Sequence, residues 1–199
     1  MTVNSMPTLL RSMQARRPPL CVEHVRDQRL ELDADETAFG VHLRGVERCD
    51  IVCTACRVAQ ISIEDCADVR VSFVSVVASV EVMRCRGVHL TYAGSCGTIT
   101  IDGSSHIAMN IPAATVDAVW VVATRVSHLC LRLQKDDDDG ILPTTASTSK
   151  AGSDSIDASD KPVNARDLVL DVVDNSTITW QNGAFVASPL ERHALFTTL

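Results

Sequence analysis

The chain has 199 residues, a formal net charge of −7 at pH 7, 46% hydrophobic residues and only 4% aromatic residues. This length fits one domain with a substantial core, and the abundant Val and Ile predict an aliphatic, strand-rich core rather than packed helices. The acidic balance and scattered basic residues argue against nucleic-acid binding, and no apolar run approaches the length of a membrane span. The N-terminus lacks the apolar core of a secretory signal, so we expect a cytoplasmic protein.

Residues 1–19 are predicted to form a flexible N-terminal arm that ends at Pro18-Pro19. Three arginines precede the first acidic residue, Glu23, and this bias loosely resembles a mitochondrial presequence. Because only these three arginines carry the targeting signal, the flexible arm is the favoured interpretation.

An apolar alternation returns along residues 20–133 at an interval of nineteen residues. One column of the repeat consists of the triplets Val69/Val71/Phe73, Val88/Leu90/Tyr92 and Ile107/Met109/Ile111. A second column consists of the pairs Ile61/Ile63, Val80/Val82 and Ile99/Ile101. Both columns continue upstream at an interval of twenty residues and downstream to Leu133, and the last unit carries about two extra residues, which we assign to the turn 123–127.

Each repeat therefore holds two short strands separated by a tight polar turn. One strand pair cannot bury its inward face alone, so successive copies must stack. We predict an all-β fold, a parallel β-helix of about six coils with a C-terminal β-hairpin. A leucine-rich repeat would need a fixed leucine pattern, and an antiparallel sandwich would need hairpin turns throughout, whereas Asn-Gly occurs only at Asn182-Gly183.

The chain has eight cysteines, which raises the question of a metal or redox site. Cys53 and Cys56 have a ligand-like spacing, but structural zinc commonly needs two such pairs. Cys66 and Cys85 lie one repeat apart, with Ser104 at the same position of the next repeat. In a β-helix these side chains stack on adjacent coils, where a small thiol or hydroxyl fits a crowded turn. We therefore predict structural cysteines, no bound metal and no cofactor.

The composition changes after Leu133. Residues 134–163 are rich in Asp, Ser, Thr, Gly and Ala and are predicted to be a disordered insert. The acidic run 136–139 is interpreted as solvated charge, because a calcium loop needs alternating ligands and a terminal Glu. Apolar alternation returns in residues 164–199, where the segments flanking Asn182-Gly183 are predicted to form a β-hairpin that docks on the last coil.

Several segments resemble the C-terminal domain of the cyclase-associated proteins, namely Ile61–Cys66, Thr98–Asp102 with His106, and Trp180–Gly183 followed by Phe185. The resemblance covers about residues 18–133 and 168–193. It implies a right-handed β-helix that dimerises by exchanging C-terminal hairpin strands between subunits. It also implies a cytoskeleton-associated protein, not an enzyme, that binds actin monomers, prefers their ADP-bound form and promotes nucleotide exchange.

Strand alternation and this resemblance together place the actin-contacting residues at outward positions of one sheet of the β-helix. The predicted residues are Glu64, Asp65, Arg70, Glu81, Arg84, Arg86, His89 and Asp102. The resemblance also implies dimerisation contacts in the C-terminal hairpin, from Ile178, Trp180, Asn182, Gly183, Phe185 and Val186.

A similar coil pattern occurs in tubulin-folding cofactor C, whose domain stimulates GTP hydrolysis through an arginine. Arg125 is the candidate here, and it lacks the glutamine of that family's motif. The alternative functions are therefore a tubulin-folding cofactor C-like protein or a noncatalytic scaffold without actin contacts. The histidines are dispersed and form no catalytic set, although His106 and His128 are expected to stack on adjacent coils.

Overall fold

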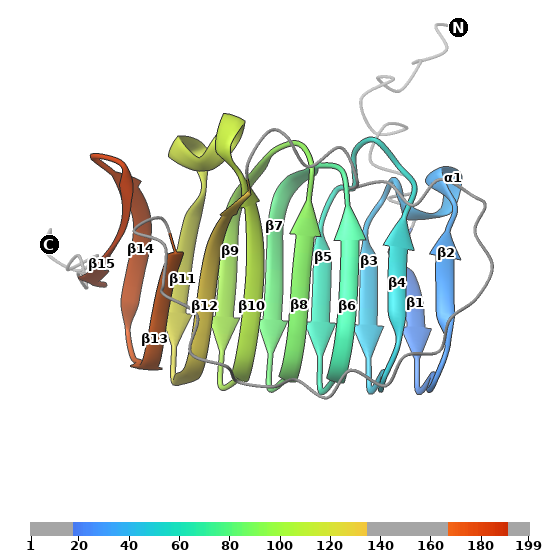
Figure 1. Ribbon diagram of the computed structural model, residues 1–199. Coiled ribbons are helices and arrows are strands. Elements are labelled where there is room, and N and C mark those ends of the chain that lie inside the picture. The colour runs from blue at the N-terminus through green and yellow to red at the C-terminus, as the bar shows by residue number, and fades with distance from the viewer. Residues whose placement is uncertain (1–17, 135–166, 191–199) are drawn as a thin grey trace, which may run out of the picture.

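The computed structural model describes residues 18–134 and 167–190, which form a parallel β-helix of about six turns (Figure 1). Each coil contributes one strand to each of two sheets, so the predicted fold class is confirmed. The predicted N-terminal arm, apart from its last two residues, and nearly all of the predicted insert lie outside the described residues.

Two sheets face each other across the core. The eight-stranded sheet has, in spatial order, the strands β1 (Leu20–Glu23), β3 (Val41–Arg44), β5 (Ile61–Glu64), β7 (Val76–Met83), β9 (Cys96–Asp102), β11 (Trp120–Thr124), β14 (Ser176–Gln181) and β15 (Ala184–Pro189). The seven-stranded sheet has the strands β13 (Asp167–Val173), β12 (Val126–Gln134), β10 (Ser105–Pro112), β8 (Arg86–Tyr92), β6 (Ala67–Phe73), β4 (Asp50–Cys53) and β2 (Arg29–Leu32). A short helix, α1 (Ala34–Thr37), connects β2 to β3.

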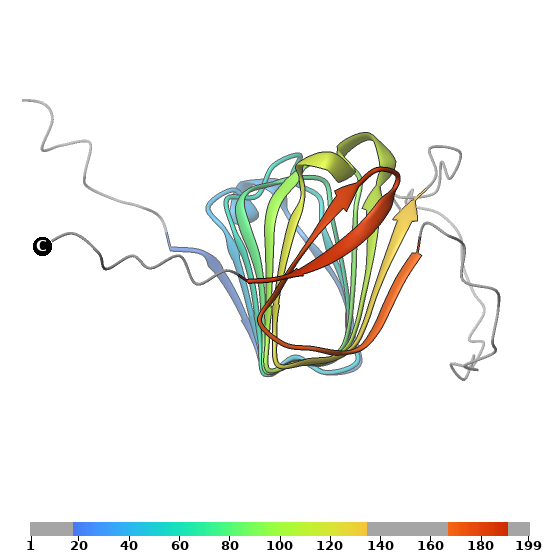
Figure 2. The ribbon, with the colours of Figure 1, turned by 90° about the vertical axis from the view of Figure 1, so that its left-hand side faces the viewer.

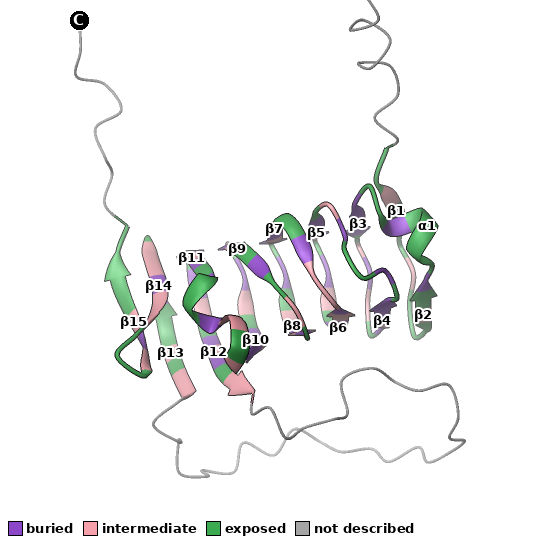
Figure 3. Ribbon diagram, turned by 90° about the horizontal axis from the view of Figure 1, so that it is seen from above, coloured by how far each residue is buried: buried purple, intermediate pink, exposed green. Residues whose placement is uncertain are grey.

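The register of the parallel strands follows the sequence repeat. Val80 pairs with Ile61 on one side and with Ile99 on the other, and all three side chains are fully buried. Equivalent side chains therefore stack along the axis and fill the space between the sheets with aliphatic groups. Figure 3 shows that buried positions recur along the strands of both sheets. Fully burying one such side chain contributes about 1.5–3 kcal/mol, so the stacked columns are the main source of stability. Phe73 and Tyr92 add a stacked aromatic pair, with ring centroids 5.3 Å apart.

The last coil differs from the repeat, as expected, but the extra residues lie elsewhere than predicted. Ile99 pairs with Val121 and Ile107 pairs with Leu129, which are longer intervals than in the preceding coils. The added length is a 3₁₀ helix, η2 (Ala113–Ala118), between β10 and β11. The assignment of the extra residues to the turn 123–127 was therefore wrong, because that turn keeps the short form of the other coils.

The C-terminal strands cover the end of the last coil (Figure 2). β13 pairs antiparallel with β12, and β14 pairs antiparallel with β11, so each sheet continues beyond the parallel coils. β14 and β15 form a hairpin whose turn is Asn182-Gly183, with φ of 52° and 85°. Positive φ at both central residues is what a tight hairpin turn requires, and Asn-Gly is the sequence that adopts it most readily.

Candidate functional site

The two sheets meet along one edge in a row of tight turns. We call this row the corner; it comprises residues 23–29, 44–50, 64–68, 83–87, 102–106 and 124–128. In each turn two residues three positions apart have left-handed backbone conformations, and these residues are His24, Asp27, Gly45, Arg48, Asp65, Asp68, Arg84, Gly87, Gly103, His106, Arg125 and His128. Because a non-glycine residue in this conformation is strained by roughly 1 kcal/mol, the stacked neighbours must hold each turn in place.

A ladder of small polar side chains lies inside the corner. The thiol of Cys85 accepts a hydrogen bond from the backbone N–H of Cys66 at 3.4 Å and donates one to the carbonyl of Met83 at 3.2 Å. The hydroxyl of Ser104 repeats the arrangement one coil later, accepting from the N–H of Cys85 at 3.0 Å and donating to the carbonyl of Asp102 at 2.9 Å. The side chains of Cys85 and Ser104 therefore have a hydrogen-bonding role as well as a packing role, because each accepts a hydrogen bond from a backbone N–H of the neighbouring coil.

Ion pairs between adjacent coils line the outside of the corner. Arg84 binds both carboxylate oxygens of Asp65, at 2.8 and 3.1 Å, and lies 3.6 Å from Glu64. Arg48 binds both carboxylate oxygens of Asp27, at 2.6 and 2.8 Å. The hydrogen bond from Arg84 lowers the pKa of Asp65, so the pair stays charged well into the acidic range. Because these side chains are exposed, the pairs fix side-chain positions more than they add stability.

The predicted actin-contacting residues do not share one sheet face. The corner holds most of them: Glu64, Asp65, Arg84, Arg86 and Asp102. Glu81 lies on the outer face of the eight-stranded sheet, whereas Arg70 and His89 lie on the outer face of the seven-stranded sheet. The expectation of a single face was wrong, because alternation separates inward from outward positions but does not say which outward positions lie at a corner.

The outer face of the seven-stranded sheet carries an open groove of about 960 Å³. Arg70, Arg86, His89, His106, His128 and Arg132 line the part of it that runs from β6 to β12. His106 and His128 stack in parallel, as predicted, with ring centroids 4.4 Å apart. The sequence prediction missed Arg132, although its register could have been found by extending the repeat, in which Thr91, Asn110 and Arg132 occupy equivalent positions.

The candidate for a catalytic arginine, Arg125, is engaged within the corner. The guanidinium of Arg125 binds both carboxylate oxygens of Asp102 at 2.8 Å. The backbone N–H of Arg125 donates a hydrogen bond to the carboxylate of Asp174 at 3.2 Å. Arg48 and Arg84 pair with a carboxylate of the preceding coil in the same way. The contacts of Arg125 therefore do not favour the cofactor C-like alternative.

The predicted dimerisation residues lie on β14, β15 and the turn between them. Ile178 is buried and Phe185 nearly so, and the ring of Phe185 meets that of Trp180 edge to face at 4.8 Å. Val186 is half-buried, and Asn182 and Gly183 form the exposed turn. In a single chain these residues cover the last coil, which leaves their role between two chains as a proposal.

The described residues contain no group of three or more His, Cys, Asp or Glu side chains that could hold a metal ion. Cys53 is buried, and this burial raises its pKa to about 12, whereas Cys56 is exposed. Within residues 18–134 and 167–190 there is also no helix long and apolar enough to cross a membrane.

The stacked coils, the charged corner and the C-terminal closing strands define a β-helix binding domain. A family model described as "Adenylate cyclase associated (CAP) C terminal" matches residues 17–145, and the chain belongs to this family. The family is one of binding domains and is not a recognised family of enzymes.

Among solved structures, the chain is similar to one entitled "Crystal Structure of Cyclase-Associated Protein from Cryptosporidium parvum". The two share 15% sequence identity with a TM-score of 0.55, and the match covers 94% of this chain and 98% of that chain. At this level of identity the likeness shows a common fold. No curated protein matches the chain.

Proposed function

We propose that this chain binds actin monomers in the cytoplasm, prefers their ADP-bound form and promotes nucleotide exchange, and so returns monomers to the polymerisable pool. The observation that carries the proposal is membership of the cyclase-associated protein C-terminal family, which is known for actin binding. No bound nucleotide or metal is needed for such a role. An exchange factor accelerates nucleotide release by binding an open conformation of its partner more tightly than the closed one.

The corner of the third to fifth coils is the surface that suits this function best. Its charges alternate in sign, and the ion pair of Arg84 with Asp65 holds two of them in fixed positions. Arg86 lies next to this pair and forms no ion pair within the described part of the chain, so its guanidinium is available to a carboxylate of a partner. Complementary charge of this kind steers association and selects the partner. Glu81, Arg70 and His89 flank the corner on either sheet.

The test is release of a fluorescent ADP analogue from actin monomers, measured with the wild-type chain and two charge-reversal variants. Arg86→Glu is expected to weaken the acceleration by about tenfold, or about 1.4 kcal/mol, because it places a negative charge at the contact. Arg57→Glu is the matched control, since Arg57 is an exposed arginine between β4 and β5, away from the corner. Arg57→Glu should behave as wild type.

A wild-type chain that leaves nucleotide release unchanged and retains no actin in a pull-down would overturn the proposed function. If both variants lost the same fraction of the acceleration of nucleotide release, actin binding would stand, but the corner would be rejected as the binding surface. Thermal unfolding of each variant shows whether the fold is intact.

The C-terminal hairpin is proposed to join two copies of the chain by strand exchange. The strands β13 and β15 end their sheets, and each leaves one edge unpaired within the described residues. Two of the exposed side chains on β13 are large and apolar: Val169 is 52% exposed and Val172 is 80% exposed. An unpaired, apolar edge is a site at which a second chain adds. A two-fold exchange would allow the same surface to serve both subunits.

A further inference from the structure

The groove on the seven-stranded sheet concentrates positive charge in a protein whose net charge is −7. At the end of the groove near β2 and β4 the arginines are balanced, since Arg48 pairs with Asp27 and Arg29 lies 3.6 Å from Asp50. Between β6 and β12 the lining holds three arginines and one carboxylate, that of Asp68. Arg70, Arg86 and Arg132 form no ion pair within the described part of the chain.

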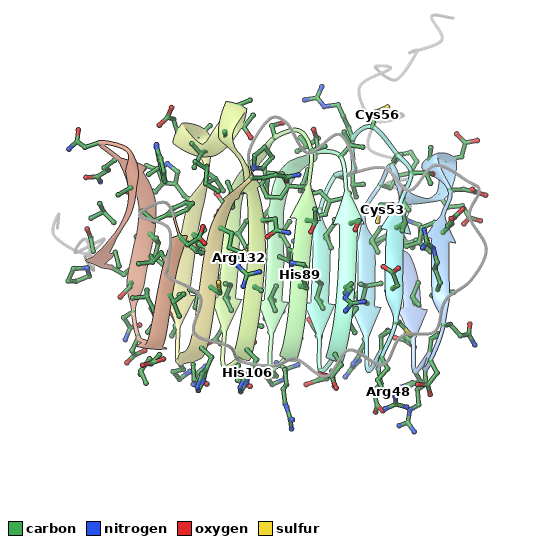
Figure 4. The ribbon with its side chains drawn as sticks, in the orientation of Figure 1. Arg48, Cys53, Cys56, His89, His106 and Arg132 are labelled. Carbon is green, nitrogen blue, oxygen red and sulfur yellow. The ribbon has the colours of Figure 1, made fainter. Side chains whose placement is uncertain are left out.

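Three of the basic side chains converge on one part of this face. Arg70 and His89 are register partners on β6 and β8, and neighbouring strands lie about 4.8 Å apart. Arg132 projects from β12, and Figure 4 shows its side chain extending across β10 toward His89. Burial and the nearby Arg70 lower the pKa of His89, with a further contribution from Arg132 and a partial offset from Asn110. Each of the two arginines therefore lies close enough for its charge to act on His89.

The polar groups at this point are incompletely satisfied. Among the described residues, the Nε2 atom of His89 is buried and has no hydrogen-bond partner. Buried polar atoms are normally paired, so an orphaned imidazole nitrogen between two unpaired guanidinium groups marks a place for an acceptor that the chain itself does not supply. The side chains of Asn110 and Thr91, which are hydrogen-bonded to each other at 3.3 Å, add neutral polar groups beside it.

We propose that this part of the groove binds a phosphate group, held by Arg70 and Arg132 with the imidazole of His89 between them. Planar guanidinium groups bind phosphate oxygens in pairs, and several donors around one centre suit a compact anion with many oxygens. An extended acidic peptide fits less well, because it would need a free strand edge for its backbone, whereas these residues lie in the middle of a sheet. The site adjoins the proposed actin contact at the corner, where Arg70 and His89 lie on its flank, and its ligand is a phosphate ester or polyphosphate.

The test uses inorganic pyrophosphate as the probe and isothermal titration calorimetry on the whole chain, with no actin present. Pyrophosphate is expected to bind, and Arg132→Gln is expected to weaken the binding by at least tenfold, because charge-assisted hydrogen bonds are among the stronger ones. Arg70→Gln should weaken the binding to a similar extent. This second variant keeps the test valid if Arg132→Gln does not fold. Arg57→Gln removes the same charge outside the groove and should leave the affinity unchanged.

Two further arms identify the source of the phosphate group. Tripolyphosphate in solution represents a free ligand, and vesicles of phosphatidylcholine that contain phosphatidic acid represent a lipid headgroup. Binding in either arm that depends on Arg132 supports the site. No binding of pyrophosphate, or an equal loss in Arg57→Gln, would refute it. An oligo-aspartate peptide that binds more tightly than pyrophosphate would also refute it, in favour of an acidic protein segment. Because actin is absent, failure here does not bear on the proposed actin function.

Discussion

At the scale of single residues, the corner depends on side chains that replace missing backbone partners. The thiol of Cys85 and the hydroxyl of Ser104 occupy the same position in successive coils, and each accepts a backbone N–H from the coil before it. The hydrogen bond with Cys66, followed by burial, raises the pKa of Cys85, so that this side chain remains a neutral thiol that can donate to the carbonyl of Met83.

This arrangement predicts different outcomes for two substitutions of Cys85. Cys85→Val keeps a small apolar shape but leaves the N–H of Cys66 and the carbonyl of Met83 without that partner, and should lower the free energy of unfolding by about 1–3 kcal/mol. Cys85→Ser keeps a donor and an acceptor and should lie within about 1 kcal/mol of the wild type. Urea unfolding followed by circular dichroism measures both. A Cys85→Val chain as stable as Cys85→Ser would show that the side chain acts only by filling space.

The sequence repeat identified these residues but not their interaction. An interval of nineteen residues between Cys66 and Cys85 predicts stacking, and stacking is observed. The left-handed backbone of Arg84 was not predicted, because arginine gives no signal for that conformation, whereas Asp65 is of a residue type that adopts it more often. In Arg84 this conformation is supported by the backbone hydrogen bond from its N–H to Asp102 in the next coil and by the ion pair with Asp65.

At the scale of single elements, the hairpin of β14 and β15 is specified by its turn. Gly183 has φ of 85°, which an L-amino acid adopts at an energetic cost, and nothing lies within 4 Å of where a Cβ atom would stand. Gly97 in β9 has equally open space around such an atom but no positive φ. The two glycines thus separate the effect of backbone conformation from that of steric contact.

Gly183→Ala is therefore expected to destabilise the protein by about 1 kcal/mol, because it forces alanine into the left-handed region. Gly97→Ala is the matched control and should be neutral or slightly stabilising, because it restricts the unfolded chain without straining the folded one. Thermal unfolding of both variants beside the wild type measures the difference. Equal effects at the two positions would contradict a role for the backbone conformation of Gly183.

Elements with a strong period or a strong turn signal were predictable, and the others were not. The strands between Ile61 and Ile111 follow from alternation, and the hairpin follows from Asn182-Gly183. The helices α1 and η2 were missed, since each is a short connection of four to six residues with no periodic pattern. Such segments take their conformation from the ends they join, which the sequence alone does not position.

At the scale of the whole molecule, a solenoid offers separate surfaces because every outward column runs the length of the axis. The corner presents alternating ion pairs, the seven-stranded sheet presents a groove with unpaired arginines between β6 and β12, and the C-terminal end presents exposed valines on β13. Repetition made the architecture readable from sequence. The sequence did not predict which outward residues lie together on one surface. Their grouping depends on the width of the turns and on long side chains, such as Arg132, that extend across neighbouring strands.

The C-terminal surface carries the last prediction, which concerns assembly. If two chains exchange hairpins, the exposed Val172 lies beside the incoming strands, and Val172→Asp would place a charge in an apolar contact. This variant should remain folded and weaken the dimer by at least tenfold, because an unpaired charge buried at an interface is strongly unfavourable. Light scattering over a range of concentrations gives the mass of the species present.

Val77→Asp is the matched control, because Val77 is 62% exposed on β7, far from the closing strands. It should leave the mass unchanged. Deleting residues 168–199 removes the closing strands altogether and should yield a monomer or an aggregate, since the last coil then exposes both sheet edges and its apolar core to solvent. A truncated chain that remained a discrete dimer would place the subunit contact on another surface. The N-terminal coil would then be a candidate, because β1 and β2 end their sheets and each leaves one edge unpaired within the described residues.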